Sequence, residues 1–161
     1  MSQLVIEKLD FLIGTWTGRG VADFPTIKRT EYFEELKFIP GEDNSVIFYE
    51  LKSWTIDNGD RGSVLSWQAG FVIELEDGSF EMSNAQNNGR VEVLSGKLKA
   101  CDDYIYNLSF ESKVFGNDER LVKTSRDFYI TGDEMKYTMF MATQMTPEFQ
   151  KHLEGELVKQ S

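Results

Sequence analysis

The sequence contains few of the residues on which metal clusters and disulfides depend. It has one cysteine, Cys101, and one histidine, His152, among 161 residues. A single cysteine excludes an internal disulfide and a thiolate metal cluster. A single histidine excludes every mechanism that needs two imidazoles, such as a zinc site with two histidine ligands. Any chemistry that this chain performs therefore uses one imidazole or none.

Positive charge and long apolar segments are also scarce. Lys and Arg number 17 against 27 Asp and Glu, which gives a formal net charge of −10. The clustered cations that hold phosphates or anionic lipid surfaces are missing, so we expect neither a nucleic acid nor a membrane as a partner. The apolar runs are too short to span a bilayer, and the first residues show no signal-peptide pattern. These absences predict a soluble, cytoplasmic protein.

The composition is that of a folded globular domain. Hydrophobic residues make up 40% of the chain and aromatic residues 13%, which is too apolar for a disordered chain. The length fits a single domain covering residues 1–161. Turn signals such as Asn58-Gly59, Asp77-Gly78 and Asn88-Gly89 recur along the chain. Asn-Gly and Asp-Gly pairs accept positive φ at low cost and so favour tight hairpins.

Apolar and polar residues alternate between these turns. Met135, Tyr137, Met139 and Met141 alternate with polar neighbours, and similar patterns recur along the chain. About ten such segments, joined by short hairpins and without a crossover helix, predict an all-β fold. The expected architecture is an antiparallel up-and-down β-barrel of the lipocalin or fatty-acid-binding-protein type. A barrel of more than about eight strands leaves room for a ligand in its interior.

Two further stretches refine this expected barrel. Residues 4–12 have the apolar spacing of one or two helical turns, and this short N-terminal helix would plug one mouth of the barrel. Residues 64–75 place Leu65, Trp67, Phe71 and Ile73 on one strand face. Trp16 would close the plugged end against the helix.

Four motifs occur in an order that points to a known family. Residues 14–20 read Gly-Thr-Trp-Thr-Gly-Arg-Gly and are followed by Phe-Pro-Thr-Ile at 24–27. Residues 83–93 and 141–153 supply the other motifs. Together they resemble the nitrobindin family, whose members are haem-binding β-barrels shaped like fatty-acid-binding proteins. The resemblance covers about residues 9–158, nearly the whole chain. Residues 66–74 depart from the family pattern because a histidine and an arginine are missing.

The resemblance implies a set of site residues. His152 would be the axial ligand of the iron of one b-type haem per chain, a group that a shallow site can lose during preparation. Pro25, Thr26 and Ile27 would form the opposite, distal wall, with Thr26 as the nearby hydroxyl. A basic residue would pair with the haem propionates. The candidates for this role are Arg120, Lys123 and Arg126.

The resemblance also implies an activity, namely nitric oxide binding and the isomerisation of peroxynitrite to nitrate, and so possible enzyme function. A rival interpretation is a haem-free carrier of a fatty acid or another small apolar ligand in the cavity. A third is a barrel kept for a protein–protein role. The sequence leaves the oligomeric state open, with a dimer as one option.

The strand around His152 presents a conflict. Strict alternation places His152 on the same face as Glu154 and Glu156, and a buried face does not accommodate two carboxylates. Three solutions are open: the strand leaves the cavity there, a bulge at Gly155 reverses the faces, or His152 lies at the mouth.

Two other groups of residues have less specific interpretations. Glu34 and Glu35 are adjacent, so a strand points them to opposite faces and they cannot form a glycosidase pair. The methionines suggest either a soft cavity wall or ordinary core filling. They are Met135, Met139, Met141 and Met145.

Overall fold

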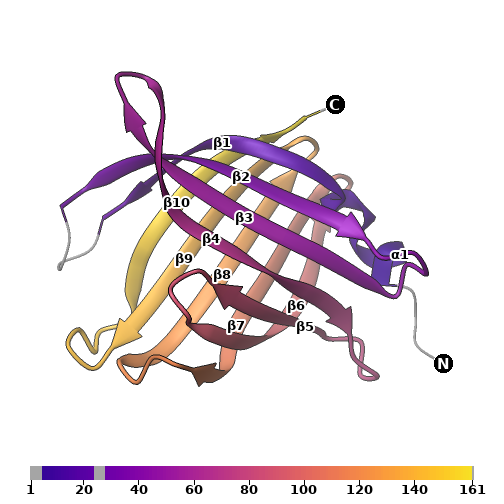
Figure 1. Ribbon diagram of the computed structural model, residues 1–161. Coiled ribbons are helices and arrows are strands. Elements are labelled where there is room, and N and C mark those ends of the chain that lie inside the picture. The colour runs from indigo at the N-terminus through magenta and orange to yellow at the C-terminus, as the bar shows by residue number, and fades with distance from the viewer. Residues whose placement is uncertain (1–4, 24–27, 161) are drawn as a thin grey trace.

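The structure is a computed structural model that describes residues 5–23 and 28–160. Ten antiparallel strands form a closed barrel in which the last strand, β10, pairs with β1 and completes the circle (Figure 1). The strands are β1 (Gly14–Ala22), β2 (Thr30–Pro40), β3 (Val46–Asp57), β4 (Asp60–Glu74), β5 (Phe80–Gln86), β6 (Val91–Asp102), β7 (Ile105–Gly116), β8 (Leu121–Thr131), β9 (Glu134–Thr143) and β10 (Gln150–Lys159). The predicted all-β up-and-down barrel is confirmed.

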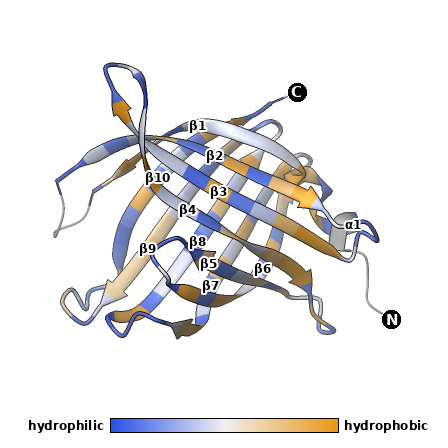
Figure 2. Cartoon of the chain, in the orientation of Figure 1, coloured by the Kyte–Doolittle hydropathy of each residue, from blue (hydrophilic) through white to orange (hydrophobic). Residues whose placement is uncertain are grey.

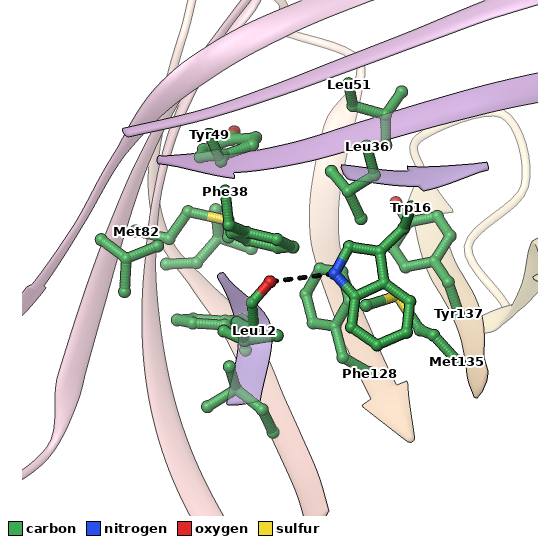
Figure 3. Packing of buried hydrophobic residues seen from close by; sticks show 14 of the residues in the cluster. Leu12, Trp16, Leu36, Phe38, Tyr49, Leu51, Met82, Phe128, Met135 and Tyr137 are labelled. Carbon is green, nitrogen blue, oxygen red and sulfur yellow. Dashed lines mark hydrogen bonds between the residues drawn. The ribbon is translucent and has the colours of Figure 1, made fainter. Parts of the chain in front are cut away.

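The N-terminal segment closes one end of the barrel. A short helix, α1 (Val5–Leu9), continues into a 3₁₀ turn, η1 (Asp10–Leu12). Leu9, Leu12 and Trp16 are completely buried there. The indole Nε1 of Trp16 donates a hydrogen bond of 2.9 Å to the carbonyl oxygen of Leu12, as Figure 3 shows. Trp16 therefore packs against the N-terminal segment as the sequence predicts.

The hydrophobic core fills the barrel near this closed end. In Figure 2, β2 and β3 become strongly hydrophobic toward the end near α1. Phe38, Tyr49 and Phe128 pack there at ring-centroid distances of about 6 Å. Such tilted and edge-on pairs add to the free energy gained from burial alone. Because the aromatic rings occupy this half, the space for a ligand lies toward the other end.

The fourth strand has the shared apolar face that the sequence predicts, and this face points to the outside of the barrel. Trp67 and Phe71 are 47% and 49% exposed, while Gln68 and Val72 face the interior. The apolar face that the sequence suggests therefore points outward over most of β4. The register shifts between β3 and β4 near Trp54 allow the strand to change its facing there.

Glycines in β1 let other side chains approach its backbone. Gly20 pairs with Tyr32 in β2, and a Cβ at Gly20 would lie 2.4 Å from the Tyr32 ring. The Tyr32 side chain therefore occupies the space that a larger residue would need. Positive φ at Asn58 and Gly59 confirms the predicted tight turn between β3 and β4. Among the described residues, no helix has the length and apolar character needed to cross a bilayer.

Candidate functional site

A cavity of about 390 Å³ lies at the end of the barrel away from α1. Its position follows from the strand register, because Trp16 at the plugged end pairs with Lys159 while Ala22 pairs with Leu153 at the other end. The residues that line it come from β4, the β5–β6 turn, β8, β9, β10 and the adjoining loops. They are Ser66, Gln68, Gln86, Arg90, Asp118, Arg120, Leu121, Met139, Met141, Thr143, Met145, Thr146, His152 and Leu153.

A β-bulge in β10 turns His152 into this cavity. The pairing between β10 and β9 shifts between Lys151 and Leu153, so His152 and Leu153 both line the cavity. His152 is only 7% exposed. The alternation conflict is resolved by a bulge at His152 itself, not at Gly155. Beyond the bulge, Glu154 points outward and forms ion pairs of 2.7 Å with Lys136 and Lys151.

The surroundings of His152 favour a neutral imidazole with one tautomer. Its Nδ1 lies 3.2 Å from the carbonyl oxygen of Gln150. A carbonyl oxygen only accepts hydrogen bonds, so we assign the proton to Nδ1, which leaves a lone pair on Nε2. Burial lowers the pKa of His152. The hydrogen bond to Gln150 raises this pKa, and the charge of Arg90 lowers it. The ring is therefore neutral at neutral pH, which is the protonation state in which an imidazole can bind a metal.

Two arginines meet at one carboxylate on the cavity wall. Arg90 Nη2 lies 2.7 Å from Asp118 Oδ2, and Arg120 Nε lies 3.0 Å from Asp118 Oδ1. Hydrogen bonds from Arg120 and Arg90 hold the pKa of Asp118 well below its usual range. Each guanidinium retains donors for a further anion. Arg120 was predicted at the site; Arg90 was not, although it lies within the family-like stretch 83–93.

The other two predicted cations lie elsewhere. Lys123 pairs with Glu111 at 2.9 Å, and its ammonium lies over the Phe149 ring. Arg126 is 1% exposed and lies inside the barrel. Neither residue lines the cavity described above.

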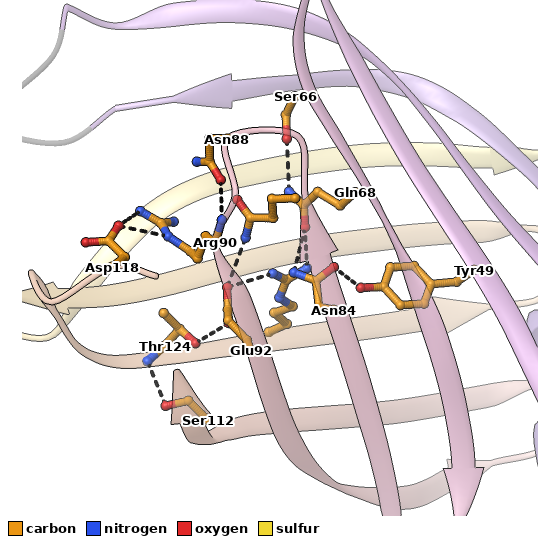
Figure 4. A network of polar contacts seen from close by, with 12 residues as sticks. Tyr49, Ser66, Gln68, Asn84, Asn88, Arg90, Glu92, Ser112, Asp118 and Thr124 are labelled. Atoms are coloured by element: carbon orange, nitrogen blue, oxygen red, sulfur yellow. Dashed lines mark hydrogen bonds and ion pairs between the residues drawn. The ribbon is translucent and has the colours of Figure 1, made fainter. Parts of the chain in front are cut away.

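Arg126 belongs to a buried polar network beside the cavity, and Figure 4 labels its members Tyr49, Gln68, Asn84 and Glu92. It donates to Gln68 Oε1 at 2.9 Å and lies 3.3 Å from Glu92 Oε1. Asn84 also donates to Gln68 Oε1, at 3.2 Å, and accepts a hydrogen bond from the Tyr49 hydroxyl. Gln68 thus connects this network to the cavity surface. Sequence reasoning missed it, although it occupies the stretch where the family-like pattern loses its histidine.

The methionines and the expected distal wall have different outcomes. Met139, Met141 and Met145 line the cavity, and Met135, Met139 and Met141 all belong to the hydrophobic core. Residues 25–27, the predicted Pro25, Thr26 and Ile27 wall, lie outside the described residues. The preceding residue Asp23 donates a backbone hydrogen bond of 3.0 Å to the carbonyl oxygen of His152. The end of the described β1 segment therefore lies beside the His152 bulge.

Comparison with known proteins places this geometry in context. Residues 5–159 match the family model described as the THAP4-like, heme-binding beta-barrel domain. A peroxynitrite isomerase of Arabidopsis thaliana is 31% identical over 154 residues, which cover 96% of this chain and 88% of that protein. A peroxynitrite isomerase of Nocardioides sp. is 31% identical, over 93% of this chain and 90% of that protein.

Solved structures show the same fold. The crystal structure of Rv2717c from M. tuberculosis superposes with a TM-score of 0.88 at 24% sequence identity, over the whole of both chains. A phycobiliprotein lyase from Guillardia theta superposes with a TM-score of 0.60 at 11% identity, over 100% of this chain and 94% of the other. These likenesses concern the barrel fold alone.

Proposed function

Because the chain belongs to the THAP4-like haem-binding β-barrel family, we propose that it ligates one b-type haem through His152 and isomerises peroxynitrite to nitrate. The family match confirms the resemblance to nitrobindins found in the sequence. Relatives that are 31% identical over most of their length are peroxynitrite isomerases, which supports the reaction. The observation that carries the proposal is the buried imidazole that a bulge turns into an open-ended cavity.

The cavity residues fit the chemistry of a haem. Leu121, Met139 and Met141 supply apolar surface for a porphyrin ring. His152 supplies one nitrogen donor for iron, with Nδ1 held by the Gln150 carbonyl. Arg90 and Arg120 supply cations for the two propionates, held in place by their shared contact with Asp118. We assign no propionate to Lys123, because its ammonium is engaged on the outer surface.

The chain's own contribution to the reaction is binding, orientation and the exclusion of competing chemistry. When bound, ferric haem would supply a Lewis-acidic iron with one coordination position left for a small ligand such as peroxynitrite or nitric oxide. Peroxynitrite and nitrate contain the same atoms and carry the same charge, so the reaction needs no net proton transfer. A single imidazole that acts as a ligand, and not as an acid or a base, is therefore sufficient.

The test is a hemin titration of the purified chain and two variants, followed by absorption spectroscopy. We expect a Soret band typical of histidine-ligated haem for the parent protein and its loss in His152→Ala. Lys151→Ala is the matched control, because its side chain points outward to Glu154, and it should bind hemin like the parent. An unchanged Soret band in His152→Ala would refute the ligand assignment.

Activity is tested separately by mixing the hemin-loaded protein with peroxynitrite and measuring its decay together with the nitrate yield. We expect faster decay and a higher share of nitrate than with the haem-free protein. Hemin that binds without accelerating decay would contradict the isomerase proposal. No spectral change on hemin addition, with displacement of a bound fluorescent fatty acid, would instead support the haem-free carrier.

A further inference from the structure

A second chamber of about 260 Å³ adjoins the cavity that contains His152. The two share Ser66, Gln68 and Leu153 as a common wall. The second chamber extends toward β2 and β3, where Tyr32, Glu34 and other side chains line it. Tyr137 of β9 also lines it, and only β1 and β10 separate β9 from β2. It therefore lies directly beside the proposed haem site and shares part of its wall.

Three polar atoms on the wall of this chamber are buried without a hydrogen bond of normal geometry. Among the described residues, no group meets hydrogen-bond geometry with the hydroxyls of Tyr32 and Tyr137 or with Glu34 Oε1, although Tyr32 lies beside Glu34 and Arg126 beside Tyr137. The three residues are 3%, 1% and 2% exposed. Burial of polar groups without partners is costly, so native interiors rarely leave several of them in one place. A hydrogen-bonding molecule in the chamber would remove this cost.

The backbone near Glu34 leaves the space open. A Cβ atom at Gly155 would lie 3.9 Å from Glu34 Oε1, and Gly155 pairs with Gly20 in the adjacent strand. At Gly155 no side chain fills this part of the interior, whereas the space beside Gly20 is taken by the Tyr32 ring. The apolar remainder of the chamber wall includes Leu51, Leu65 and Leu153.

The charges around the chamber favour an uncharged ligand. Arg126 is already paired with Glu92, both being buried. Burial raises the pKa of Glu34 to about 7, although Tyr32 and Arg126 oppose this shift. A charged ligand would lose its hydration on entering this buried chamber, and an anion would in addition be repelled by the charged form of Glu34. A neutral molecule meets neither penalty.

The number of free hydrogen-bonding positions indicates the functional group. A hydroxyl has one donor and two acceptor positions. The chamber offers one carboxyl oxygen to receive that donor and two phenolic O–H groups to fill the acceptor positions. We infer that this chamber binds a small uncharged alcohol or phenol, with its hydroxyl on Tyr32, Glu34 and Tyr137 and its apolar body on the leucines. At about 30 Å³ per water-sized volume, a chamber of 260 Å³ has room for a ring of phenol size. This inference does not depend on haem.

The experiment compares phenol with toluene, which has nearly the same shape but no hydroxyl, by calorimetry and saturation-transfer NMR on the full chain without haem. We expect phenol to bind about tenfold more tightly than toluene. Tyr32→Phe and Tyr137→Phe should each weaken phenol binding severalfold while leaving toluene unchanged. Tyr129→Phe is the matched control, because Tyr129 is 45% exposed on the barrel surface.

Further measurements separate this inference from the haem proposal. His152→Ala should lose the haem spectrum and retain phenol binding, while Tyr32→Phe should retain the haem spectrum. Glu34→Gln provides an isosteric third variant, and thermal unfolding of each variant verifies that it is folded. Equal affinity for phenol and toluene, no binding of either, or phenol binding that the two Tyr→Phe variants leave unchanged would overturn the inference and leave a chamber for water only.

Discussion

Two charged residues, Arg126 and Glu92, lie in the mostly apolar interior of the barrel. Arg126 and Glu92 are 1% and 0% exposed and depend on each other and on amide and hydroxyl neighbours. Such a pair does not by itself indicate high stability, because both ions lose their hydration. Removal of one partner is nevertheless damaging, because the other is then left as an uncompensated buried charge.

We therefore predict that Arg126→Met lowers the free energy of unfolding by about 3–5 kcal/mol, measured by urea denaturation. Combining it with Glu92→Leu should recover part of this loss, since neither charge then remains buried. A single variant as stable as the parent would contradict the assigned pairing.

Glu34 should make the folded protein less stable as the pH rises, which is the reverse of the usual effect of a carboxyl group. Its pKa is about 7 in the folded protein against an ordinary 4.5, because burial disfavours the carboxylate. The folded state therefore holds this proton more tightly than the unfolded state does. The stability contribution is fully present below about pH 4.5 and is lost as the pH rises through about 7.

The corresponding prediction concerns Glu34→Gln. Relative to the parent, this variant should gain on the order of 3 kcal/mol between about pH 5 and pH 8. Urea denaturation at both pH values measures the difference. The control is Glu35→Gln, which removes a carboxylate from the outer face of the same strand. A gain with the opposite sign would show that another group dominates.

At the scale of elements, close strand contacts and one bulge shape the interior. Gly18 lies against the backbone of β10, where a Cβ would be 1.9 Å from the Glu156 carbonyl oxygen. At Gly155, across the same strand pair, a Cβ would come no closer than 3.7 Å to its neighbours. Replacing each of these two glycines with alanine therefore tests how closely the β1 and β10 backbones approach each other at that position.

Gly18→Ala should lower the free energy of unfolding by about 1–3 kcal/mol, because the β1 and β10 backbones must move apart. Gly155→Ala should change it by less than about 1 kcal/mol. Thermal or urea unfolding measures both. Equal losses would indicate that the β1–β10 contact is looser than the structure has it.

At the scale of the whole molecule, the net charge of −10 opposes compaction. Salt screens this repulsion, because the Debye length falls from about 30 Å at 0.01 M to about 10 Å at 0.1 M. We predict that the Tm rises by a few degrees over this range. Calorimetry in sodium chloride checks the shift. A falling Tm would mean that screening of surface ion pairs outweighs the relief of repulsion.

The sequence by itself determined the strands, the turns and the family. Alternation and Asn-Gly or Asp-Gly turns are local signals, since they depend on neighbours within a few residues. Trp16 and the single His152 could be singled out from the family-like motifs that contain them. The departure of residues 66–74 from the family pattern also marked the stretch from which Gln68 enters the interior.

Only the tertiary structure decided which of these side chains meet. The bulge that turns His152 inward arises from pairing between β9 and β10. That Trp67 faces outward and Gln68 inward depends on which side of the sheet is turned inward when the barrel closes. Arg126 and Glu92 are 34 positions apart in sequence, and Tyr32 and Tyr137 line one chamber although they are far apart in the chain. Such contacts follow from closure of the sheet, which no local alternation of residues encodes.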